Sequence, residues 1–287
     1  VTDRGWTVRQ VLAWTVELFD QRGVGRTARL DAELLLARVL GKNRLGVYLD
    51  LDRPLDETER RLLRGLVVRR ANGEPVAYLL GRREFYGLDL AVDPRVLIPR
   101  PETELLVDEA LARLPPDATG PVVDVGAGSG AIALALAHER PHLQVCAVEL
   151  EQGAAEVARH NAQALGLQSR VQVVRGDLLG PLAACSLPMV VSNPPYIAPG
   201  DPALSPEVAR YEPARALYGG RTGLELIRRL LDEAARALVP GGWLLCEIGA
   251  TQGPAVSALV SQAGLIPEGI RNDLAGLPRV ALARRRS

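Results

Sequence analysis

The residues with the clearest chemical potential lie in the stretch VVSNPPYI, residues 190–197, where an apolar run ends in an amide side chain, two prolines and an aromatic ring. Adjacent prolines end a strand, because neither has an N–H to donate and each has its φ angle fixed. The residue before a proline is held in extended geometry, which fixes the backbone of Asn193. The side-chain oxygen of Asn193 and the main-chain carbonyls of Asn193 and Pro194 thus offer neighbouring acceptors, and two acceptors match one NH₂ group.

A second such stretch, VVDVGAGSGAIALALA at residues 122–137, has the pattern of a strand, a glycine turn and a helix. Its glycines allow a tight turn and close approach of a ligand to the backbone. The candidate loop residues are Gly126, Ala127, Gly128, Ser129 and Gly130. Asp124 stands two residues before the first glycine. An acid there suits a cationic ligand, such as the amino group and sulfonium of S-adenosylmethionine, better than it suits a pyrophosphate.

Further candidate ligand contacts follow the next two predicted strands. The first of these strands ends at Glu149, whose carboxylate could accept hydrogen bonds from both hydroxyls of a ribose. The second is followed by Asp177, which could accept a hydrogen bond from an adenine amino group, with Leu178 against the ring. Together these strand ends could hold an adenosine.

Two other interpretations of the glycine loop stay open. Gly126-x-Gly128-x-x-Ala131 also fits the dinucleotide fingerprint of a nicotinamide dehydrogenase, although no hydride-handling residue can be located. The turn could also serve packing alone. The letters HERPH at residues 138–142 match the zinc-protease pattern H-E-x-x-H, but Pro141 would break the continuous helix which that pattern needs, so no metal is predicted.

The two acceptors at Asn193 and Pro194 suit a planar NH₂ group, as in an amide or a nucleobase amine. The lone pair of such a nitrogen is delocalised. Holding both hydrogens favours the pyramidal geometry in which the lone pair turns toward a methyl donor, which helps the transition state more than the ground state. Tyr196 would stack on the planar group and align it for in-line attack. The alternative is a proline-rich strand end with a packed tyrosine.

Composition narrows the function classes. The 287 residues include 34 basic and 34 acidic side chains, and this balance argues against a bulk electrostatic nucleic-acid binder. No apolar stretch is long enough for a transmembrane helix, and no signal peptide pattern is present. Three scattered cysteines suggest neither a disulfide framework nor a zinc cluster. A soluble cytoplasmic protein is expected.

The first 75 residues have a helical pattern and contain no catalytic constellation. Apolar residues fall on one helical face at Val8, Val11, Leu12, Thr15, Leu18 and Phe19, and again at Leu34, Leu35, Val39 and Leu40. A third helix is predicted over 56–70, with its apolar face at Leu62, Leu63, Leu66 and Val67. Residues 78–98 are rich in β-formers with Gly87 between two candidate strands, which predicts a hairpin, and a capped helix is predicted over about 101–114.

From residue 121 onward, predicted strands and helices alternate. The strands are 121–125, 144–149, 171–175, 189–192 and 243–247, and the helices are 131–139, 153–165 and 224–238. This alternation builds a mostly parallel sheet with helices on both faces, and ligands bind at the carboxyl ends of such strands.

The motifs resemble those of a known family. DVGAGSGAIALALA followed by SNPPYI is similar to amino-methyltransferases that act on planar nitrogens, and residues 73–111, which contain LIPRPETE, resemble the HemK/PrmC family of glutamine methyltransferases that modify peptide-chain release factors. The stretches 212–231, 238–253 and 273–284 continue the resemblance. It covers nearly the whole chain, and it is weakest over the first 70 residues.

The resemblance implies an α/β fold: a seven-stranded Rossmann-like class I methyltransferase domain over 101–287, a small all-helical domain over 1–75 that recognises the release factor, and a hairpin linker over 76–100. It implies transfer of a methyl group from S-adenosylmethionine to the glutamine amide of the Gly-Gly-Gln motif in class I release factors. We expect a hinge near residues 74–100.

The resemblance also implies roles for single residues. The loop 126–130, Glu149, Asp177, Leu178 and Asn193 would contact the donor. Asn193 and Pro194 would bind the glutamine NH₂ group, and Pro195 and Tyr196 would shape the pocket. The residues implied as its wall are Pro99, Arg100, Pro101, Glu102 and Thr103. Two departures are mild: Glu149 stands where the family often has Asp, and Leu178 stands where some members carry an aromatic residue.

Three alternative functions remain open. A nucleic-acid adenine methyltransferase would also hold a planar NH₂ group, but it needs a surface to grip a base, and no large basic insert is present. A relative acting on a ribosomal-protein glutamine is closer still. A non-catalytic binding module is the third rival, and the intact glycine loop argues against it.

Overall fold

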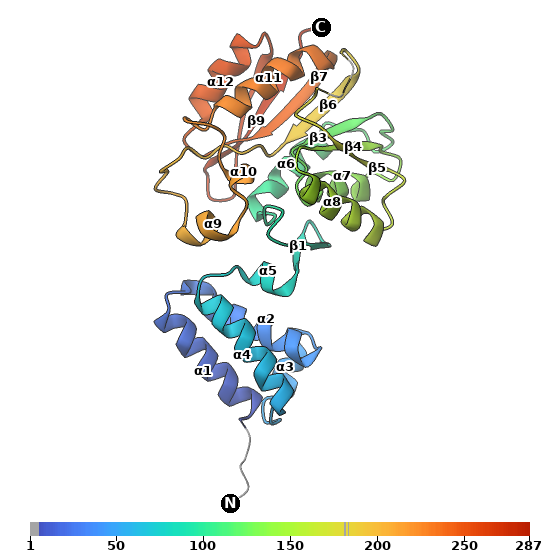
Figure 1. Cartoon of the computed structure of the whole chain (residues 1–287). Helices are drawn as coiled ribbons and strands as arrows, with labels where there is room; N and C mark the ends of the chain where they lie inside the picture. Colours follow the sequence, from blue (N-terminus) through green and yellow to red (C-terminus); the bar gives the residue numbers. More distant parts are fainter. Residues whose placement is uncertain (1–5, 181, 183) are drawn as a thin grey trace, which may run out of the picture. The chain divides into compact units, whose positions relative to one another are not determined.

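The computed structural model describes residues 6–180, 182 and 184–287 of the chain, which forms two compact units, residues 1–82 and 83–287 (Figure 1). The division falls after Arg82, so a short helix at residues 76–80 belongs to the first unit and the hairpin, apart from its first residue, belongs to the second.

The described part of the first unit is helical, as the sequence predicts. Its elements are α1 (Val8–Gln21), η1 (Gly25–Thr27), α2 (Ala28–Leu40), α3 (Arg44–Leu49), α4 (Glu57–Ala71) and α5 (Val76–Leu80). Capping boxes at Thr7 and Asp56 begin α1 and α4, because each side chain accepts from the main chain of the first turn. Gly41 adopts a left-handed conformation that ends α2.

The core of the first unit contains Phe19, Leu35 and Leu36, all fully buried. The helical spacing therefore identified most of the buried face of α1, but on α2 only Leu35 of the predicted residues is buried, Leu34, Val39 and Leu40 are half-buried, and the buried Leu36 was not predicted. On α4 the expectation was wrong in one place: Leu62 is 54% exposed, whereas Leu63 and Val67 are buried. Adjacent residues on a helix are about 100° apart, and on α4 this rotation turns Leu62 to the exposed side.

A buried ion pair crosses the first unit from α2 to α4. The Nε of Arg70 donates to Oδ2 of Asp31 over 2.7 Å, and both side chains are at most 5% exposed. The Thr27 hydroxyl donates to the same oxygen over 3.1 Å. A buried charge that loses its partner keeps the full cost of its removal from water.

We predict that Asp31→Ala lowers the free energy of unfolding by about 3–5 kcal/mol, because the buried Arg70 guanidinium loses its ion pair with Asp31. Urea unfolding followed by circular dichroism measures this change. Asp52→Ala is the matched control, since the Asp52–Arg9 pair is largely exposed and is worth about 1 kcal/mol or less. Equal losses in the two variants would contradict the prediction.

The second unit is built on a seven-stranded sheet, which confirms the predicted fold class. Its strands are β3 (Val122–Val125), β4 (Val145–Glu149), β5 (Val171–Arg175), β6 (Leu187–Ser192), β7 (Leu238–Glu247), β8 (Ile266–Asn272) and β9 (Pro278–Arg284). The spatial order is β5-β4-β3-β6-β7-β9-β8. Only β9 runs antiparallel to its two neighbours, and the other pairings are parallel.

Strand order reverses at β3, and this reversal places the site. From β3 the chain moves outward to β4 and β5, then returns to pair β6 with the other side of β3. Val125, the last residue of β3, lies opposite Ser192, the last residue of β6. The loops that follow these two residues therefore begin side by side, at the point where doubly wound sheets bind their ligands.

Helices cover both faces of this sheet (Figure 1). The second unit also contains η2 (Pro101–Thr103), α6 (Glu104–Leu111), α7 (Ala131–Glu139), α8 (Gln152–Ala164), α9 (Pro206–Tyr211), α10 (Ala214–Leu217), α11 (Glu225–Ala237) and α12 (Gly253–Gln262). Helices α6, α7 and α8 pack on one face, with Val122 and Val145, whereas α11 and α12 pack on the other, with Val123 and Val148.

Some boundaries differ from those predicted. The hairpin is shorter, β1 (Arg82–Phe85) and β2 (Leu88–Ala91), because Pro75 starts α5 and a left-handed Gly81 ends it. The helix expected over 101–114 is a 3₁₀ turn followed by α6. Helix α7 ends at Glu139, so His138 and His142 do not share one helix. No helix in the described part of the chain is long and apolar enough to span a membrane.

Candidate active site

The glycine loop joins β3 to α7 and is fixed by its backbone conformation. Gly126, Gly128 and Gly130 have φ angles of 73°, 55° and 84°, which lie in the left-handed region that favours glycine. A Cβ on Gly130 would also come within 3.1 Å of the Leu134 side chain. The N–H of Gly126 donates to Val148 of β4 over 2.8 Å, which ties the loop to the sheet.

Asp124 lies beneath this loop and is fully buried. Its Oδ2 accepts from the N–H of Ala133 in the first turn of α7 over 3.1 Å, and its Oδ1 has no partner in the described part of the chain. Burial raises the pKa of this carboxyl to about 7, and the nearby charge of Glu149 adds to the rise.

Glu149 is the last residue of β4, the strand that follows β3 in the chain. One carboxylate oxygen accepts from the N–H of Gly128 and the other from the N–H of Glu151, both over 2.8 Å. The residue is 8% exposed. Each oxygen keeps a further lone pair, so the carboxylate can accept from a ligand while it holds the loop in place.

Asp177 and Leu178 follow β5. Asp177 is half exposed and forms an ion pair with Arg229 over 2.8 Å. Leu178 is buried with a φ angle of 49°, which is uncommon for a side chain larger than that of asparagine. Such strain persists where the surrounding structure fixes it, and it is found most often at ligand sites.

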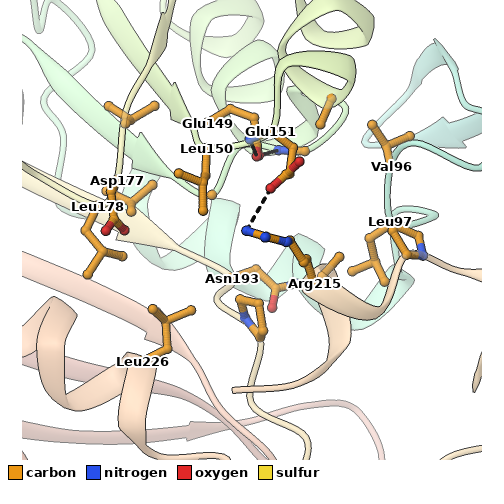
Figure 2. A pocket seen from close by; sticks show the side chains of 18 of the residues that line it. Val96, Leu97, Glu149, Leu150, Glu151, Asp177, Leu178, Asn193, Arg215 and Leu226 are labelled. Carbon is orange, nitrogen blue, oxygen red and sulfur yellow. Dashed lines mark hydrogen bonds and ion pairs between the residues drawn. The ribbon is translucent and has the colours of Figure 1, made fainter. Parts of the chain in front are cut away.

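These strand ends surround one cavity, with about 800 Å³ of empty space that includes open solvent (Figure 2). The predicted donor residues on its wall are Gly126, Gly128, Glu149, Asp177, Leu178 and Asn193, together with Pro195. Arg215 and Glu151 pair over 3.0 Å across it (Figure 2). Other predicted donor residues lie outside that wall: Asp124, Ala127, Ser129 and Gly130.

Asn193 follows β6 and is held from behind. Ser192 Oγ donates to the Val125 carbonyl over 2.7 Å, and Nδ2 of Asn193 donates to the Thr103 hydroxyl over 3.1 Å. No donor in the described part of the chain contacts Oδ1 of Asn193 or the carbonyl of Pro194. Two acceptors therefore remain available at this strand end.

A second cavity lies on the other side of Asn193. Its predicted wall residues are Arg100, Asn193, Pro194 and Tyr196. The two cavities share Leu97, Asn193 and Ala216. A donor in the first cavity and an acceptor in the second would therefore meet at the Asn193 side chain.

The stretch 99–103 is anchored beside the second cavity. Glu212, which is buried, accepts from the main chain of Ile98 over 3.1 Å and forms an ion pair with Arg100. Pro99 and Thr103 are buried, whereas Pro101 and Glu102 are exposed, and these four lie outside the cavity wall.

Glu247, at the carboxyl end of β7, is a residue of the site that was not predicted from the sequence. Its two carboxylate oxygens accept from the hydroxyls of Thr103, over 2.7 Å, and Tyr196, over 3.1 Å. Burial raises the pKa of Glu247 and also that of Tyr196. The available signal was the pattern WLLCE, an apolar strand ending in an acid, which is the same pattern that pointed to Glu149.

Comparisons with known proteins show the family of this chain. Residues 10–81 match the model of the PrmC N-terminal domain, and residues 102–208 match that of the methyltransferase small domain. The release factor glutamine methyltransferase of Geobacter sulfurreducens is 46% identical over 96% of this chain and 95% of its own length. That of Escherichia coli is 40% identical over 94% of this chain and 97% of its own length.

A solved structure supports the fold. The crystal structure of a methyltransferase from Pyrococcus furiosus aligns with a TM-score of 0.54 and 19% identity, over 77% of this chain and 98% of its own. The seven-stranded sheet, the glycine loop and the matched domain define an S-adenosylmethionine-dependent methyltransferase. Within that class, the chain belongs to the release factor glutamine methyltransferase family.

We predict that Gly219→Ala displaces the main chain at Pro195, because a Cβ on Gly219 would overlap the Pro195 carbonyl oxygen. Overpacking of this kind costs about 1–3 kcal/mol. Urea unfolding measures the loss, and a crystal structure of the variant shows the displacement. Gly65→Ala is the control, since a Cβ on Gly65 meets open space in α4. Unchanged stability and geometry in Gly219→Ala would refute the close approach.

A pH dependence follows from Asp124. Its pKa of about 7 in the folded chain exceeds its value of about 4 in the unfolded chain, so the folded state binds more protons between these values. Stability is therefore lost as the pH rises through this window. We predict that Asp124→Asn removes this loss, so its stability relative to the unmodified chain is a few kcal/mol higher at pH 8 than at pH 5. Parallel pH curves from urea unfolding would rule out the raised pKa.

Proposed function

We propose that this chain transfers the methyl group of S-adenosylmethionine to the side-chain amide nitrogen of the Gly-Gly-Gln glutamine in class I release factors, leaving S-adenosylhomocysteine and modulating translation termination. The observation that carries the proposal is the place of Asn193, between the two cavities and with Oδ1 free to accept. The names of the relatives supply the acceptor. The site of action would be the cytoplasm, where release factors work.

The residues of the first cavity fit the donor. Glu149 offers acceptor lone pairs beside the glycine loop, where the ribose hydroxyls need them. The free Oδ1 of Asp177 and the buried Leu178 suit the amino group and the ring of an adenine. Asp124 lies outside that cavity wall and is unpaired at Oδ1; in its ionised form it would favour a cationic ligand. When bound, S-adenosylmethionine supplies an electrophilic methyl group.

The residues of the second side of the site prepare the acceptor. Oδ1 of Asn193 and the Pro194 carbonyl would each accept one hydrogen of the glutamine NH₂ group. That pair of bonds strengthens as the nitrogen becomes pyramidal and gains positive charge, so it favours the transition state. The nitrogen becomes acidic once it is alkylated, and no strong base is needed before attack.

The remaining predicted residues shape the pocket. Tyr196, held at its hydroxyl by Glu247, would pack against the planar amide, and Pro195 would separate the acceptor from the donor side. Arg100 would border the entrance, while Pro99, Pro101, Glu102 and Thr103 would support it from behind. The helical first unit, which matches the PrmC N-terminal domain, would bind the body of the release factor.

We expect Asn193→Ala to lower the methylation rate by about 100-fold or more while the affinity for S-adenosylmethionine stays nearly intact, because a preorganised polar contact is lost. Tritiated S-adenosylmethionine is incubated with a purified release factor, with the same factor whose Gly-Gly-Gln glutamine is alanine, and with total RNA and DNA. Calorimetry measures donor binding.

Label on the intact factor alone would support both the reaction and the target residue. Label on nucleic acid with none on the factor would mean that the pocket accepts an adenine. Normal turnover in Asn193→Ala would remove this residue from the chemistry. Asp124→Asn tests the donor side in the same calorimeter, and unchanged affinity would refute its role.

A further inference from the structure

Three side chains from distant parts of the second unit form one line of hydrogen bonds beside the proposed acceptor site. Nδ2 of Asn193 donates to Oγ1 of Thr103 over 3.1 Å, and Oγ1 of Thr103 donates to Oε2 of Glu247 over 2.7 Å. Thr103 is 4% exposed and Glu247 is 1% exposed. Water therefore does not compete for these bonds, and their direction is set by the protein.

The direction follows from counting hydrogens. A threonine hydroxyl has one hydrogen to give, and an ionised carboxylate can only accept. The Thr103 hydrogen is thus committed to Glu247, and its oxygen must receive a hydrogen from Asn193. Only the NH₂ end of the Asn193 amide can supply that hydrogen. The amide oxygen then necessarily points the other way, toward the two cavities.

Glu247 is placed to remain an acceptor. Two hydroxyls, those of Thr103 and Tyr196, donate to it. Burial raises the pKa of Glu247, and the hydrogen bonds from Thr103 and Tyr196 and the charge of Arg279, which lines the second cavity, act against that rise. The charge of Glu102 acts in the opposite sense. In its ionised form Glu247 has acceptors only, and that form enforces the hydrogen order from Glu247 through Thr103 to Asn193.

We propose that Glu247 is a positioning residue that fixes the amide orientation of Asn193 through the Thr103 hydroxyl. This inference rests on the proposed function, in which Oδ1 of Asn193 accepts from the substrate NH₂ group. In the reversed orientation, Asn193 would present its own NH₂ group to that of the substrate, and two donors would face each other. Glu247, which also lines the second cavity, thus sets which end of the Asn193 amide faces the substrate, although it reaches Asn193 only through Thr103.

The test compares variants along the line. Thr103→Val removes the hydroxyl at nearly constant volume, and Glu247→Gln leaves one acceptor oxygen for two hydroxyl donors. We expect kcat for release factor methylation to fall about 10- to 100-fold in each, because a reacting group that is only slightly misplaced costs up to about 100-fold. Calorimetry should show S-adenosylmethionine affinity within about twofold of the unmodified chain.

Two further measurements separate positioning from folding. The double variant Thr103→Val/Glu247→Gln should have a kcat no more than about threefold below that of Thr103→Val alone. Substitutions of residues that act through one another have non-additive effects. Thr103→Ser keeps the hydroxyl and should recover most of the lost kcat. Thr119→Val makes the same exchange at an exposed loop position and is the control for folding.

A direct readout does not depend on turnover. Selective ¹⁵N labelling of the five asparagines gives side-chain NH₂ signals by NMR, and Asn193→Ala identifies the one of interest. We expect one Asn193 NH₂ hydrogen to exchange with solvent at least tenfold more slowly than those of exposed Asn272. Thr103→Val should remove this protection.

The outcomes are distinguishable. If the unmodified chain methylates the release factor while Thr103→Val and Glu247→Gln keep full kcat, the positioning role is refuted and the proposed function stands. If the chain does not methylate the factor but the Asn193 signal is protected as described, the proposed function fails and the hydrogen-bond order stands. Fast exchange of the Asn193 hydrogens in the unmodified chain overturns the inference whatever the activity.

Discussion

Strands β3 and β6 pair in parallel with Val125 opposite Ser192, and every functional group of the second unit depends on this register. The glycine loop starts one residue after Val125, and Asn193 comes one residue after Ser192. The hydrogen bond from Ser192 to the Val125 carbonyl holds the two ends together inside the core. A shift of one residue would turn every side chain of β6 to the opposite face and separate the two halves of the site.

The prolines that follow Asn193 and the glycines that pack against them both restrict the backbone of this segment. Pro194 and Pro195 fix φ along the chain, so this segment cannot relax by rotating. Gly219 and Gly223 come so close to the carbonyls of Pro195 and Tyr196 that a Cβ on either would overlap an oxygen. The rigid prolines at 194–195 and the glycines at 219 and 223, which have no side chain, together allow a single path for the backbone. The acceptor geometry is therefore set before any substrate arrives.

Features that depend on neighbours in sequence could be predicted, and the structure shows why. The glycine loop, the strand ends at Glu149 and Asn193, and the parallel sheet all follow from local patterns of apolar residues, glycines and prolines. The bond between Thr103 and Glu247 joins residues 144 positions apart, and no local pattern encodes such a distance. Helices α9 and α10 were missed for a related reason: each is short, and tertiary contacts rather than periodicity decide such elements.

The carboxylates of Glu149 and Glu247 occupy similar places in the sheet but have two different effects on the site. Each acid ends a strand of the sheet, and each is nearly buried. Glu149 accepts from the backbone N–H groups of Gly128 and Glu151, so it fixes the shape of a loop. Glu247 accepts from two side-chain hydroxyls, so it fixes the direction of hydrogen bonds. Burial of a carboxylate is costly without such donors, and the donors here supply both the compensation and the order of the site.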